Sequence, residues 1–111
     1  MRSFITLLLL AATQADASSL DRTSLKAVLQ RAAPDFKRCY ERALERRPEL
    51  TGRARLRLEI AASGRVAEVT VEFPVEAPEL TQCLGEAASK LQFLKGPGPY
   101  QLVWPIVFKR A

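Results

Sequence analysis

Apolar residues recur at steps of three and four over residues 25–44, a pattern typical of a helix with one buried face. The apolar positions are Leu25, Val28, Leu29, Ala32, Phe36, Cys39, Tyr40, Ala43 and Leu44. Pro34 interrupts the pattern and predicts either a kink or a restarted helix, with Asp35 in the first turn of the restart. We expect the helix to end near Arg46 or Arg47.

Over residues 53–60 apolar and polar residues alternate with a period of two, which predicts a half-buried strand. Inward positions Ala54, Leu56, Leu58 and Ile60 alternate with outward positions Arg53, Arg55, Arg57 and Glu59. A tight turn at Ser63 and Gly64 leads into a second strand, "RVAEVTVEF". A two-residue turn there predicts the inner pairs Leu58–Val69 and Leu56–Val71 and the outer pair Arg55–Glu72.

A second helix is predicted to begin near Pro78, with Glu79 in its first turn. Its apolar face consists of Leu80, Cys83, Leu84, Ala87, Ala88 and Leu91. The sequence Gly-Pro-Gly-Pro at residues 96–99 ends this segment. The final segment, "YQLVWPIVFK", is predicted as a strand with Leu102, Trp104, Ile106 and Phe108 facing the core. Pro105 cannot donate a ladder hydrogen bond, so this strand belongs at an edge.

The element order is therefore helix, strand, strand, helix, strand, which predicts an α+β fold. Both helices are expected to cover one face of a three-stranded antiparallel sheet, in the spatial order second, first, third strand.

The N-terminal stretch "MRSFITLLLLAATQADASS" has the outline of a secretory signal peptide. Arg2 precedes an apolar run, and Ala15 and Ala17 form a small-x-small cleavage pattern. We therefore expect a signal peptide at residues 1–17, a single domain at residues 18–111 and a periplasmic location. The alternative is a membrane anchor, but the apolar run is about half of the roughly 20 residues that a spanning helix needs.

Composition narrows the function. The 111 residues are 48% hydrophobic and 26% charged and include no His. His triads and His metal ligands are excluded, and two Cys cannot form a four-Cys zinc site. We expect no enzyme activity, no cofactor and no metal. The net charge of +5 favours anionic lipid, cell wall or an acidic partner over nucleic acid for an exported protein, although it can equally serve solubility alone.

Cys39 and Cys83 lie on the apolar faces of two helices that cover the same sheet face. In an oxidising compartment this arrangement predicts an intramolecular disulfide between them. The alternative is a pair of buried free thiols. A catalytic thiol is disfavoured, because there is no His to activate it and no CxxC motif.

The stretch "CYERALERRPELTGRARLRLEIAASGRV" resembles the TonB carboxy-terminal-like domain, in particular its AgmX/PglI branch from gliding-motility proteins. The shared features are a Cys-Tyr pair, a Pro-Glu-Leu-x-Gly step, a Gly-x-Val turn, a second Cys and an aromatic-Pro-x-x-Phe ending. In this chain they are Cys39 and Tyr40; Pro48, Glu49, Leu50 and Gly52; Gly64 and Val66; Cys83; and Trp104, Pro105 and Phe108. The resemblance covers about residues 25–109.

The resemblance implies that an extended segment of an outer-membrane or other envelope protein is bound by strand addition at the sheet edge. Without an anchor or a proline-rich spacer, we expect a free-standing, non-enzymatic binding module with no stable membrane insertion. The expected binding residues are Leu102, Val103, Trp104, Pro105, Ile106, Val107 and Phe108 of the last strand, with Arg53, Arg55 and Arg57. The alternatives are an assembly protein that homodimerises through the same edge or, if the N-terminus is not cleaved, a membrane-anchored energy-transduction component.

The cleavage pattern predicts that the mature protein begins at Ser18. The intact mass of the exported protein measures this directly. An unprocessed chain recovered in the membrane fraction would contradict it and support the anchored alternative.

Overall fold

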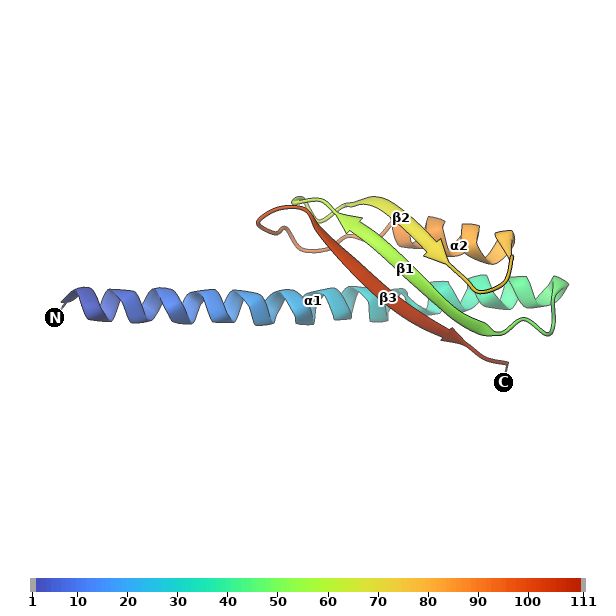
Figure 1. Ribbon diagram of the computed structural model, residues 1–111, viewed down its shortest axis with the longest axis horizontal. Helices are drawn as coiled ribbons and strands as arrows, with labels where there is room; N and C mark the ends of the chain where they lie inside the picture. The colour runs from blue at the N-terminus through green and yellow to red at the C-terminus, as the bar shows by residue number, and fades with distance from the viewer. Residues whose placement is uncertain (1, 111) are drawn as a thin grey trace.

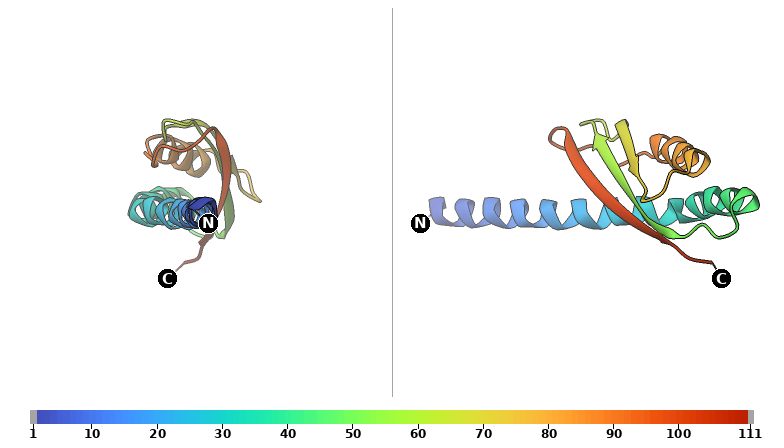
Figure 2. Two further views of the ribbon diagram at one scale, coloured as in Figure 1. Left: turned by 90° about the vertical axis from the view of Figure 1, so that its left-hand side faces the viewer. Right: turned by 45° about the vertical axis from the view of Figure 1, so that its right-hand side comes forward.

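The chain folds in the predicted order α-β-β-α-β (Figure 1). The structure is a computed structural model that describes the backbone of residues 2–110 and the side chains of residues 23–110. Its elements are α1 (Arg2–Arg46), β1 (Gly52–Ile60), β2 (Val66–Glu72), α2 (Pro78–Ser89) and β3 (Tyr100–Phe108). The antiparallel sheet has the order β2-β1-β3, and both helices lie on one of its faces (Figure 2), which confirms the predicted α+β fold.

Helix α1 runs through Pro34 without a break, so the predicted alternative of a restarted helix is wrong. An interior proline costs about 3 kcal/mol in helix propensity, but burial of an apolar face provides most of the stability of a helix in a protein. Ala32 and Phe36 are buried on either side of Pro34, while Pro34 itself faces solvent. Tertiary packing therefore outweighs the local preference, and α1 ends at Arg46 as expected.

The predicted signal peptide lies within residues 1–22, outside the side chains that the structure describes, and it stays a prediction. Over the part of the chain that was described, no helix is both long and apolar enough to cross a membrane.

The β1–β2 register matches the predicted pairs Leu58–Val69, Leu56–Val71 and Arg55–Glu72. The connection differs from the predicted two-residue turn. Ala61 pairs with Arg65 around a three-residue loop, and the register shifts by one residue next to Ile60. The extra loop residue and the bulge compensate for each other. For this reason the pairs from Arg55 to Glu59 follow the predicted register.

The core lies between the inner face of the sheet and the two helices. Ala54, Leu56, Leu58 and Ile60 of β1 are each at most 1% exposed. They pack in one cluster with Leu80, Leu84 and Ala88 of α2 and with Leu29, Ala32, Phe36, Cys39 and Tyr40 of α1. The strict alternation along β1 thus buries one complete side of the central strand.

Two adjacent residues connect α1 to the rest of the domain. Cys39 forms a disulfide with Cys83 of α2, with 5.6 Å between the Cα atoms. Tyr40 donates a hydrogen bond from its hydroxyl to the backbone oxygen of Leu50, just before β1. Its ring also stacks on Phe108 at the end of β3, with 4.6 Å between the ring centroids. The disulfide is the predicted one, and it joins the two helices.

The hairpin loop packs against the segment that follows α2. Phe93 donates its N–H to the backbone oxygen of Gly64 at 2.8 Å, and Gly96 donates to Ala62 at 3.0 Å. Gly64 has φ +89°, and a Cβ there would lie 2.0 Å from the backbone oxygen of Phe93. Only glycine satisfies both the left-handed backbone and the close approach.

Replacing both cysteines with alanine is expected to lower the free energy of unfolding by up to about 4 kcal/mol, because 44 residues separate them and the unfolded chain gains entropy. Urea unfolding of the double variant and of the oxidised and reduced wild type measures this. The reduced wild type should match the double variant. Equal unfolding midpoints for the oxidised and reduced wild type would contradict the stabilising role.

Gly64→Ala is expected to lower the free energy of unfolding by about 2–4 kcal/mol through backbone strain and the contact with Phe93. Gly98→Ala is the matched control, because a Cβ at Gly98 has nothing within 4 Å. The control should change stability by no more than about 0.5 kcal/mol. Equal losses in the two variants would show that the close approach at Gly64 is unimportant.

Candidate functional site

Strand β3 has β1 as its neighbour on one side and forms an edge of the sheet on the other, as predicted from Pro105. The directions in which the backbone groups of β3 point follow from the hydrogen bonds of the β1–β2 hairpin. Ala61 donates its N–H to Arg65 and accepts from Gly64, so both of its backbone groups face β2. These directions alternate along a strand. The odd-numbered residues of β1 therefore face β2, and the even-numbered residues face β3.

The odd-numbered residues of β3 consequently direct their backbone groups away from β1. Pro105 pairs with Arg55, an odd-numbered residue of β1, so its missing N–H falls on the open side and the ladder to β1 is intact. Val103 and Val107 share this parity and present both N–H and C=O to the open edge, whereas Pro105 offers only C=O. The edge can thus pair with another strand, with one donor missing at its middle.

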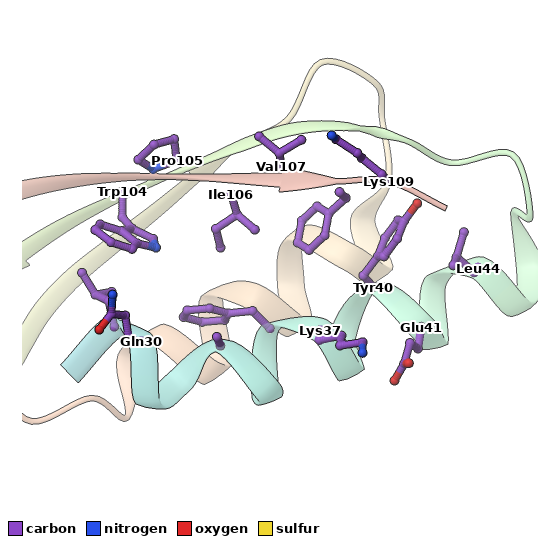
Figure 3. A pocket seen from close by; sticks show the side chains of 14 residues that line it. Gln30, Lys37, Tyr40, Glu41, Leu44, Trp104, Pro105, Ile106, Val107 and Lys109 are labelled. Atoms are coloured by element: carbon purple, nitrogen blue, oxygen red, sulfur yellow. The ribbon is translucent and has the colours of Figure 1, made fainter. Parts of the chain in front are cut away.

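A groove of about 540 Å³ lies between β3 and α1, on the inner side of this edge. Figure 3 shows Trp104 and Ile106 pointing from the strand toward the helix, while Pro105, Val107 and Lys109 point away from it. The helix contributes Leu29, Gln30, Ala33, Phe36, Lys37, Tyr40, Glu41 and Leu44 to the lining. The volume is within the range of about 300–1,000 Å³ that ligand pockets occupy.

Most of the lining is apolar, and polar groups come from a few long side chains. Ala33 lies on the groove wall and is exposed. Because its side chain is small, it leaves space in the groove. Lys37 and Glu41 are exposed on α1, and Lys109 is exposed just after β3. The groove therefore combines an apolar interior with charged side chains of both signs.

The outer face of the sheet, opposite the helices, carries a different surface. Val103 and Val107 are 47% and 52% exposed on β3. They are opposite Arg57 and Arg53 of β1, with Pro105 opposite Arg55 between them. An exposed apolar stripe thus runs beside the arginine stripe.

Glutamate neutralises part of the arginine stripe, as the predicted Arg55–Glu72 pair implies. Arg57 Nε lies 3.3 Å and Arg55 Nη1 lies 4.0 Å from Glu72 Oε1. Among the described side chains, Arg53 forms no ion pair. The side chains of Arg55, Arg57 and Glu72 are about half exposed, so each of the two ion pairs contributes little to stability. Arg53 is therefore the arginine of the stripe with a charge that is available to a partner.

The predicted binding residues fall on two surfaces. Leu102, Trp104, Ile106 and Phe108 face the helices, and Phe108 is only 6% exposed beneath Tyr40. Val103, Pro105, Val107, Arg53, Arg55 and Arg57 lie on the outer face. The α1 wall of the groove was not predicted. The exposed Ala33, on the side of α1 that carries Phe36 and Tyr40, was the signal that could have indicated it.

The described residues hold no metal-ligand cluster, and a smaller cavity lies elsewhere in the domain. No group of three His, Cys, Asp or Glu side chains in residues 23–110 could hold a metal ion. A smaller cavity of about 380 Å³ lies between α1 and the loop before β3, lined by Ser24, Leu25, Leu94 and residues 96–100.

No protein-family model matches this chain significantly, and neither does any curated protein or solved structure.

Proposed function

We propose that this domain is a non-enzymatic periplasmic binding module that takes up an extended segment of an envelope or outer-membrane protein at the open edge of β3. The observation that carries the proposal is the combination of unpaired backbone groups along this edge with the apolar groove beside it. Backbone pairing provides affinity in strand addition, and side-chain pockets provide specificity.

The resemblance of the chain to the AgmX/PglI branch of TonB carboxy-terminal-like domains supports the same proposal. The α-β-β-α-β order and the edge position of β3 are what that resemblance implies. The disulfide fits an oxidising compartment such as the periplasm. A role in gliding motility, transport or envelope assembly would follow from the identity of the partner.

The charge near the edge indicates the chemistry of the partner. Arg53 has no ion-pair partner among the side chains that the structure describes, and Lys109 and Arg110 follow β3 directly. A partner segment that carries acidic residues would therefore associate faster at low salt, because long-range attraction increases the rate of encounter.

Proline substitution at the open edge tests this function. Val107→Pro removes an outward N–H while the hydrogen bonds of β3 to β1 remain, so the variant should fold. Val107→Thr keeps the N–H and is the matched control. Immobilised domains are exposed to an envelope extract, and the affinity of each captured protein is then measured. The proline variant should bind at least about tenfold more weakly, equivalent to about 1.4 kcal/mol, and the threonine variant should bind like the wild type.

Folding of each variant is checked by the unfolding midpoint and by the presence of the disulfide. Val103→Pro, at the other outward position, replaces Val107→Pro if the latter does not fold. A folded proline variant that captures the same proteins with unchanged affinity would exclude the β3 edge as the binding site.

A further inference from the structure

Building on the proposed function, we infer that the bound segment belongs to a different protein and inserts a bulky apolar side chain into the groove between β3 and α1. The groove then has a role that the edge alone does not have, because it selects the sequence of the bound segment.

Side chains on a strand point to opposite faces of the sheet in turn. Every second residue of a segment paired with β3 would therefore point to the side where Trp104 and Ile106 point, toward α1 (Figure 3). There it would meet the groove.

The composition of the groove suits an apolar side chain. Phe36 and Phe108 are buried, but Trp104 and Ile106 are only half-buried, so the groove exposes apolar surface of the core. Exposed Ala33 lies among the residues that line the groove from α1. A large apolar side chain would fill this space and remove the surface of Trp104 and Ile106 from water, which is the property of an interface anchor.

A second copy of this chain fits the open edge of β3 less well than a segment of another protein does. In a twofold edge-to-edge dimer, each copy contributes its own Pro105, so the joined ladder lacks two donors near its middle. With a segment of another protein, the joined ladder contains one Pro105 and therefore lacks only one donor from β3. A dimer would also place Arg53, Arg55 and Arg57 of both copies on one continuous outer face, where each copy offers Glu72, which pairs with Arg55 and Arg57 alone. Both effects favour a heterologous partner.

Random twelve-residue peptides displayed on phage are used as the probe, selected against the disulfide-bonded domain. Selected peptides are synthesised, and their affinities are measured for the wild type and three variants. Ala33→Trp fills the groove from an exposed position on α1. Ala27→Trp is the matched control, because Ala27 is also exposed on α1 but does not line the groove. Val107→Pro removes a donor at the edge.

We expect the selected peptides to carry large apolar residues at alternate positions. Ala33→Trp should weaken their binding at least about tenfold, and Ala27→Trp should change it by less than about twofold, in line with the loss of one buried anchor. Val107→Pro should also weaken binding. The domain alone should sediment as a monomer.

The results that would contradict these expectations differ in what they exclude: the apolar anchor, strand addition or the heterologous partner. Peptides that lose affinity for Val107→Pro but not for Ala33→Trp would overturn the anchor while leaving strand addition intact. Peptides insensitive to Val107→Pro would overturn the proposed function itself. A stable dimer that blocks peptide binding would overturn the heterologous partner, and a selection without any binder would contradict both proposals.

Discussion

The structure depends on how Cys39 and Tyr40, neighbours in sequence, fix α1 in two directions. Successive residues on a helix point about 100° apart. Cys39 is bonded to α2, while Tyr40 contacts the segment before β1 and the end of β3. The helix is thereby attached to both sides of the domain at one point. The groove between α1 and β3 lies along the same stretch of helix, so this double attachment holds the helix in place beside the groove.

Because α1 and α2 cover the same face, the sheet remains open on the other face and along the β3 edge (Figure 2). Three surfaces therefore meet at β3: the unpaired backbone edge, the apolar groove, and the outer stripe of Val103, Pro105 and Val107 beside the arginines. A bound extended segment can contact all three at once. The proposed function assigns affinity to the edge, specificity to the groove and rate of encounter to the charges.

Much of the fold could be predicted because short-range periodicity determines it. The alternation in β1 predicted which residues are buried. The register with β2 was predicted from a two-residue turn, and it is the predicted one only because the bulge offsets the extra loop residue. The apolar faces of the helices, together with the expected export, predicted the disulfide. The sequence did not decide whether the helix continues through Pro34 or restarts there, since local preference at Pro34 opposes the continuous helix and only tertiary packing supports it. The groove was also missed, because periodicity shows which face of a helix is buried but not how far the helix lies from a sheet edge.

The central claim is that the odd-numbered amides of β3 are free while the even-numbered ones are bonded to β1. Amide hydrogen exchange of the monomeric domain, followed residue by residue by NMR, measures this most directly. Val103 and Val107 should exchange orders of magnitude faster than Trp104 and Ile106. Equal protection of all four amides in the monomer would mean that the edge is already occupied or directed inward, and it would contradict this account of the site.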